Sequence, residues 1–125
     1  MDQPEGFKRW SSGPVPLVCK LLKAVYGLKQ APHEWNSLLH DFLTNYGLFQ
    51  LKCDNACYAL ITPQLVVYIA VYVDDLLIFS SDPEWTKQFK LAFAAAFDIK
   101  DLGAPVRVLG MTVVHDRDQQ SLLLH

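Results

Sequence analysis

The chain has 125 residues, of which 51% are hydrophobic and 19% charged, and its formal net charge is −2. This balance is typical of one globular domain and excludes a disordered tail or a strongly basic nucleic-acid-binding segment. No apolar stretch reaches the ~18 residues that a membrane-spanning helix needs, and the N-terminus has neither the basic nor the apolar region of a signal peptide. The sequence therefore predicts a cytoplasmic or nuclear protein that is neither secreted nor membrane-bound.

The first predicted elements are an extended segment and a helix. Residues 15–26 mix apolar side chains with lysines and are predicted to be extended up to Gly27. Pro32 suits a first helical position, and Gly47 suits the C-terminal stop of the helix between them. The apolar face of this helix contains Trp35, Leu38, Leu39, Phe42, Leu43 and Tyr46.

Two apolar runs that flank a pair of carboxylates predict a β-hairpin. Leu65 to Val73 is rich in β-branched and aromatic residues, and Leu76 to Phe79 resumes the pattern. Adjacent carboxylates repel each other, so Asp74 and Asp75 require either the exposure of a turn or a bound cation. At a turn they can approach one point and bind a hard divalent ion such as Mg²⁺, whereas simple chain reversal is the alternative.

The remaining elements complete an α+β pattern. Leu60-Ile61 is predicted as a strand before the hairpin, with a turn at 62–64. A second helix begins at Asp82-Pro83, which suit its N-cap and first position. Its apolar stripe contains Phe89, Ala92, Phe93, Ala96 and Phe97. Runs at 106–114 and 122–124 predict a final hairpin, so residues 1–125 should form one antiparallel sheet with two helices packed on one face.

Charge and cysteine content suggest two further sites. Residues 1–53 carry six Lys or Arg and four Asp or Glu, whereas residues 54–125 carry five and nine. A basic first half could face a nucleic-acid backbone, although scattered solvated charge explains any single lysine as well. The basic candidates are Lys8, Arg9, Lys20, Lys23 and Lys29.

The three cysteines do not predict a disulfide framework, because their number is odd and they lack paired spacing. Cys53 and Cys57, with one histidine, are a weak zinc pattern, and idle thiols are the favoured interpretation. Cys19 is the third cysteine, and the candidate histidines are His33, His40 and His115.

Several segments, in one order around Tyr72-Val73-Asp74-Asp75, resemble the reverse transcriptase of Ty1/copia-type retrotransposons, an RNA-directed DNA polymerase. The matching segments are Gln3–Phe7, Lys20–Trp35, Phe97–Gly103 and Val108–Met111. Several collinear motifs are more specific than any one of them, and the similarity covers nearly the whole chain. The resemblance implies part of the palm of a right-hand polymerase from a transposable element.

The resemblance implies template-directed nucleotidyl transfer. In that reaction two divalent ions, Mg²⁺ or Mn²⁺, stabilise the attacking 3′ oxygen and the leaving pyrophosphate. Asp74 and Asp75 would be catalytic, metal-binding carboxylates, and Tyr72 and Val73 would lie beside the primer terminus. The implied partners are an RNA template, a DNA primer and deoxynucleotides.

The resemblance also assigns roles outside the hairpin. Gly27, Lys29 and Gln30 would belong to a motif that binds the nucleotide or the template. The alternative is that these residues only begin the helix and contact no substrate. Lys100 stands where the family places a lysine that would assist departure of pyrophosphate, although a solvated strand-edge lysine is equally compatible. Leu109, Gly110 and Met111 resemble the hairpin that grips the primer in this family. The alternative is that these residues serve only in apolar packing.

The chain also departs from the family pattern. The first catalytic aspartate of the family precedes the Gln3–Phe7 segment, and Asp2 is too close to replace it. The fingers, thumb and ribonuclease H segments are also missing, and His33 stands where the family usually has arginine. We therefore expect a truncated polymerase with little or no activity alone. The alternative is a non-catalytic module that binds nucleic acid, or a protein through an exposed strand edge.

Overall fold

The structure is a computed structural model that describes residues 1–10, 13, 17–22, 25, 27, 28, 30–116, 118, 119 and 121–125. The chain divides into two compact units, Met1–Tyr46 and Gly47–His125. Five of the twelve residues of the predicted extended segment at 15–26 lie outside the described residues, and residues 17–22 form neither helix nor strand. Among the described residues, no helix combines the length and apolar character that crossing a bilayer requires.

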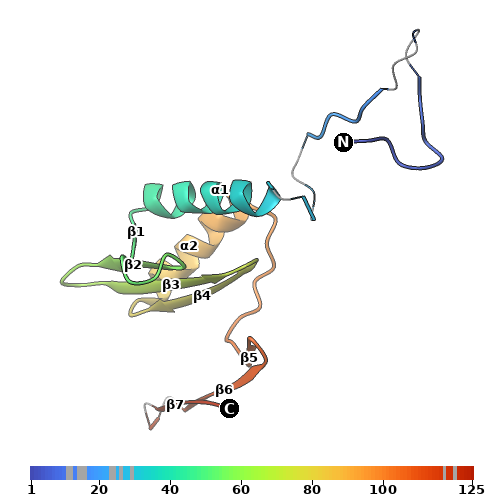
Figure 1. Cartoon of the computed structure of the whole chain (residues 1–125). Helices are drawn as coiled ribbons and strands as arrows, with labels where there is room; N and C mark the ends of the chain where they lie inside the picture. Colours follow the sequence, from blue (N-terminus) through green and yellow to red (C-terminus); the bar gives the residue numbers. More distant parts are fainter. Residues whose placement is uncertain are drawn as a thin grey trace. The chain divides into compact units, whose positions relative to one another are not determined.

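The first unit contains helix α1, Ala31–Asn45, which begins and ends as predicted (Figure 1). Its last turn closes with the Tyr46 N–H donating to the Phe42 carbonyl at 2.9 Å. Gly47 follows with φ +102°, a left-handed conformation that glycine adopts without steric cost.

One member of the predicted apolar face of α1 is not part of its buried stripe. Leu39 and Leu43 are 2% and 0% exposed, whereas Leu38 is 58% exposed. Residues four apart lie on one side of a helix, and the preceding residue is rotated by about 100° from the buried line. The predicted apolar face was therefore too wide at Leu38.

The second unit contains a four-stranded antiparallel sheet in the order β1-β2-β3-β4. Its strands are β1 (Phe49–Gln50), β2 (Cys57–Ile61), β3 (Val66–Tyr72) and β4 (Asp75–Ser80). In β3, Val67 and Ile69 are fully buried while Val66 and Tyr68 are exposed, as expected for a sheet with one covered face. The predicted β3–β4 hairpin is confirmed, whereas β2 begins earlier than predicted and β1 is too short to show an alternating pattern.

Helix α2, Pro83–Ala96, lies against β4 and begins at the predicted N-cap (Figure 1). The Asp82 Oδ1 atom accepts a hydrogen bond from the Glu84 N–H at 2.9 Å. Phe89 and Phe93 are buried, and their ring centroids lie 5.7 Å apart. The aromatic stripe therefore belongs to the core, although Ala96 at its end is exposed.

A second, three-stranded antiparallel sheet follows, in the order β5-β6-β7. It consists of β5 (Arg107–Val108), β6 (Met111–Asp116) and β7 (Ser121–Leu124). The predicted final hairpin is confirmed as β6–β7, and none of the described residues in this sheet is buried. The α+β class is confirmed, but the strands form two sheets because residues 97–106, which follow α2, form neither strand nor helix.

Candidate functional site

The carboxylate pair lies at the tip of the β3–β4 hairpin. Tyr72 and Asp75 are the last paired residues, so Val73 and Asp74 form a two-residue loop. Val73 has φ +53°, and Asp74 is not among the residues with positive φ, which is the pattern of a type II′ turn. Glycine is usual at the first position of that turn, and a β-branched residue there is strained by roughly 1–3 kcal/mol.

Both carboxylates of the tip are open to solvent. Asp74 and Asp75 are exposed, as are the side chains of Tyr72 and Val73, at 58% and 59%. Within the described part of the chain, no side chain or backbone group donates a hydrogen bond to either carboxylate, and neither forms an ion pair. Water therefore screens their mutual repulsion, and their oxygens remain available to a ligand.

The oxygen donors at the tip fit only part of a metal coordination shell. Among the described residues, no group of three or more His, Cys, Asp or Glu side chains could hold a metal ion. Mg²⁺ is commonly bound by one or two carboxylates together with substrate phosphates and waters. Asp74 and Asp75 fit such a shared site rather than a cage built from protein side chains alone.

Among the residues that the structure describes, the cysteines and histidines do not come together in the zinc site that the spacing weakly suggested. All three are free, and the Cys57 Sγ lies 3.6 Å from the Asp54 Oδ2. Burial raises the pKa of the Cys57 thiol, and the neighbouring Asp54 carboxylate raises it further. Because zinc binds the thiolate, this environment favours an idle thiol.

Gly27, Leu28 and Gln30 lie directly before α1. Gly27 has φ +93°, and the Ala31 N–H donates to the Leu28 carbonyl at 3.1 Å. Gln30 is the exposed N-cap residue, and its side chain makes no capping hydrogen bond, which leaves the amide uncommitted to the helix. Lys29 lies outside the described residues, so its predicted role remains a prediction.

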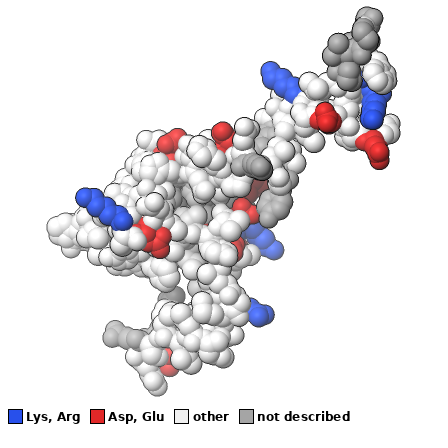
Figure 2. Space-filling model, viewed as in Figure 1, with Lys and Arg blue, Asp and Glu red and all other residues white. Residues whose placement is uncertain are grey.

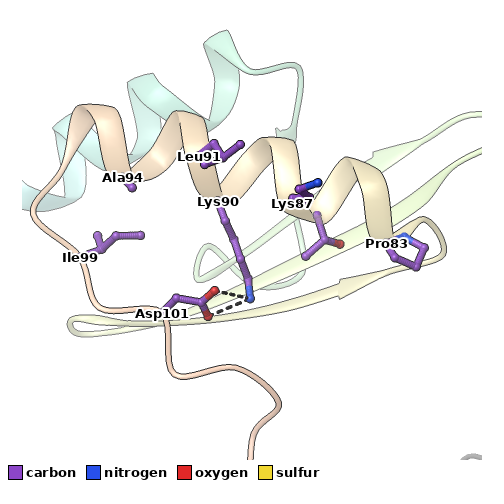
Figure 3. Close-up of a pocket in the computed structure, with 8 residues that line it drawn as sticks. Pro83, Lys87, Lys90, Leu91, Ala94, Ile99 and Asp101 are labelled. Atoms are coloured by element: carbon purple, nitrogen blue, oxygen red, sulfur yellow. Dashed lines mark hydrogen bonds and ion pairs between the residues drawn. The ribbon is translucent and has the colours of Figure 1, made fainter.

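Lys100 is exposed in the segment between α2 and β5, not at the edge of a strand. The next residue, Asp101, forms a two-pronged ion pair with Lys90 of α2, at 2.8 and 3.0 Å (Figure 3). Together with α2 the segment borders an open groove of about 480 Å³. Sequence reasoning missed this pair, because neither residue belongs to a local pattern that indicates the other.

The residues Leu109, Gly110 and Met111 form the tip of a second tight hairpin, between β5 and β6. Val108 pairs with Met111, and both loop residues have positive φ, +52° at Leu109 and +84° at Gly110. This is the pattern of a type I′ turn. Leu109 and Met111 are 54% and 40% exposed, so the tip is not packed into a core.

Figure 2 shows the basic side chains of the described residues in blue on one face, where they form separate spots within each unit. Lys8, Arg9 and Lys20 are exposed, whereas Lys23 and Lys29 lie outside the described residues. Within the second unit, the predicted hairpin residues lie in two local groups, 72–75 on one tip and 109–111 on another.

Comparisons with known proteins identify the family. Residues 1–125 match the family described as Reverse transcriptase (RNA-dependent DNA polymerase). The chain is 35% identical over 125 residues to the Retrovirus-related Pol polyprotein from transposon TNT 1-94 of Nicotiana tabacum, covering 99% of this chain and 9% of the relative. It is 38% identical over 101 residues to the Pol polyprotein from transposon RE1 of Arabidopsis thaliana, covering 81% of this chain and 7% of the relative.

A third relative is a transposon Ty5-1 protein of Saccharomyces cerevisiae, 33% identical over 113 residues, covering 90% of this chain and 36% of the relative. The chain thus spans less than half of the length of each of these relatives. No solved structure matches it at a significant level. The chain corresponds to a segment of copia-type retrotransposon Pol proteins and belongs to the reverse transcriptase (RNA-dependent DNA polymerase) family.

Proposed function

We propose that this chain supplies the catalytic hairpin of a polymerase that copies RNA into DNA by nucleotidyl transfer. The observation that carries this proposal is the β3–β4 tip, where a strained two-residue loop presents Asp74 and Asp75 to solvent. Phosphoryl transfer depends on positioning and charge stabilisation, so a rigid hairpin that carries two carboxylates suits it.

Asp74 and Asp75 would hold divalent ions, Mg²⁺ or Mn²⁺, together with oxygens of the substrate phosphates. When bound, such ions stabilise the attacking 3′ oxygen and the departing pyrophosphate. The exposed Tyr72 and Val73 would contact the primer terminus, since they flank the carboxylates at the same tip.

The other matched motifs would bind or orient the nucleic acid and the nucleotide. Gln30, at the mouth of α1 with Gly27 and Lys29, would hydrogen-bond a base or the incoming deoxynucleotide. The exposed tip formed by Leu109, Gly110 and Met111 would grip the primer through apolar and backbone contacts. Lys100, which is exposed, would donate a proton to the leaving pyrophosphate.

Metal binding at the hairpin tests the proposal directly. Paramagnetic Mn²⁺, titrated into the isotopically labelled chain, should broaden the amide resonances of residues 72–75, and Asp75→Asn should abolish the effect. Asp41→Asn, an exposed aspartate of α1, is the matched control and should behave as the unaltered chain. Broadening that survives in Asp75→Asn, or that occurs only elsewhere, would contradict the proposal.

Primer extension on an RNA template tests the reaction. Any template-dependent synthesis should disappear in Asp75→Asn and persist in Asp41→Asn. Synthesis that continues in Asp75→Asn would show that the hairpin is not the catalytic element.

A further inference from the structure

The segment between α2 and β5 borders the groove beside α2 on both sides of Lys100, and on the side of Asp101 it is joined to the helix. On one side, Ile99 is half-buried and lines the groove beside α2. On the other side, the Lys90 Nζ lies 2.8 Å from the Asp101 Oδ1 and 3.0 Å from its Oδ2. Figure 3 shows both residues, with Ile99 beside the helix and Asp101 below Lys90.

Asp101 also shapes the backbone that follows it. Its Oδ1 accepts a hydrogen bond from the Gly103 N–H at 2.9 Å, and Gly103 has φ +73°. Hydrogen bonds from Lys90 and from the Gly103 backbone lower the pKa of the Asp101 carboxyl. The carboxylate is therefore ionised at neutral pH and joins the helix to the turn.

Lys100 lies between Ile99 and Asp101 in the chain, but its side chain does not line the groove. Ile99 and Asp101 line the groove, whereas Lys100 is exposed and is not among the lining residues. Because both neighbours of Lys100 line the groove and Asp101 is bound to Lys90, the Lys100 side chain is directed away from α2 and the backbone that carries it is restricted.

We propose that Lys90 is a positioning residue, which holds Asp101 against α2 and thereby fixes the outward direction of Lys100. This inference rests on the proposed function, in which Lys100 donates a proton to the leaving pyrophosphate. Proton transfer requires the donor within hydrogen-bond distance of the acceptor, and holding a long side chain at its base favours that geometry.

The chain offers a matched control on the same helix. Lys87 forms an ion pair with Glu84 at 3.9 Å, and both side chains are about two-thirds exposed, at 68% and 65%. Both residues belong to α2, so this pair does not connect the helix to the following segment. The Lys90 side chain is only 32% exposed, and its partner belongs to the following segment.

Backbone order at Lys100, measured by ¹⁵N relaxation on the 125-residue chain, tests the proposal. Lys90→Ala should lower the order parameter of the Lys100 amide from about 0.85 to below about 0.6. Lys90→Arg should restore it because a guanidinium can bind the carboxylate at two points, and Lys87→Ala should leave it unchanged. An unchanged order parameter in Lys90→Ala would overturn the proposal.

Two further measurements keep the test specific. If Lys90→Ala also lowers the order parameters of the β3–β4 amides, the Lys100 order parameter is measured in Asp101→Asn instead. That variant removes the charge at an exposed position and conserves side-chain volume. The proposed function is judged separately, by Mn²⁺ broadening at residues 72–75. A chain that binds no Mn²⁺ there can still show order at Lys100 that depends on Lys90, and the reverse also holds.

Discussion

The two tight hairpins place similar tips on very different supports. Each has a two-residue loop whose first residue is a bulky apolar side chain at positive φ, Val73 at +53° and Leu109 at +52°. Behind Val73 lies a sheet with fully buried Val67 and Ile69. Behind Leu109 lies a sheet with no buried residue among those described.

This difference shows what stabilises a strained tip. A residue in an unfavourable conformation persists only when the surrounding structure over-determines it. The β3–β4 ladder, from Val67–Ser80 to Tyr72–Asp75, and the buried residues behind it provide that support. At Leu109 the strain is smaller, because leucine is not β-branched and Gly110 accommodates the second positive φ of the turn.

The largest expected difference between the two sheets is in the free energy of unfolding. Ile69→Ala should lower it by about 2–5 kcal/mol, because Ile69 is fully buried and a cavity would remain. Leu122→Ala, on the second sheet at 54% exposure, should change it by no more than about 0.5 kcal/mol. Urea unfolding measures both changes. Equal losses would mean that the second sheet is buried in solution.

A smaller effect is expected from relieving the strain at the catalytic tip. Val73→Gly should raise the free energy of unfolding by about 1 kcal/mol, since 1–3 kcal/mol of strain outweighs the 0.5–1 kcal/mol entropic cost of glycine. Leu109→Gly should give a smaller gain. Thermal unfolding of both variants measures the difference.

The same substitution at ordinary φ is the control for the strained tip. Val66 is an exposed residue of β3 without a positive φ, so Val66→Gly should destabilise the chain by about 0.5–1 kcal/mol. If Val73→Gly destabilised the chain as much as Val66→Gly, the loop would not be strained.

The smallest expected effect concerns the segment that leads from the first sheet to the second, and it depends on pH. The Asp101 pKa is lowered in the folded chain by the Lys90 and Gly103 hydrogen bonds. The stabilisation is therefore present above the ordinary aspartate pKa of about 3.9 and is lost as the pH falls through the lowered value. Since the pair is largely exposed, Asp101→Asn should cost less than about 1 kcal/mol at neutral pH.

Unfolding curves at neutral and acid pH measure this dependence. The difference in the free energy of unfolding between the unaltered chain and Asp101→Asn should disappear as the Asp101 carboxyl becomes protonated. Asp98→Asn, an exposed neighbour, serves as the control and should show no comparable change. If this difference stayed constant even below the pKa of the Asp101 carboxyl in the folded chain, the ionised pair would make no contribution to stability.

Features specified by adjacent residues could be predicted from the sequence. Both helices begin where proline follows a suitable N-terminal residue, and α1 ends before Gly47. The β3–β4 hairpin was predicted because apolar runs flank two acidic residues. The two-residue strand β1 was not predicted, since so short a segment carries no alternating pattern. The predicted run 106–114 contains β5, but its apolar pattern did not predict its division into β5 and β6.

Features that depend on distant residues could not be predicted in this way. The exposure of Leu38 beside the buried Leu39 depends on which part of the apolar face is covered. The Lys90–Asp101 pair joins residues that are 11 positions apart, beyond the spacing of helical neighbours. The division of the strands into two sheets is likewise decided by which strand edges pair in three dimensions.

The sequence alone determined the family, the starts of both helices, the end of α1 and the position of Asp74 and Asp75 at a turn, because each depends on the identity and order of neighbouring residues. Only the tertiary structure decided the left-handed backbone of Val73, the attachment of Asp101 to α2 and the contrast between a sheet with a core and one without. These features arise from strand register, burial and long-range ion pairing, and such interactions exist only after the chain has brought distant residues together.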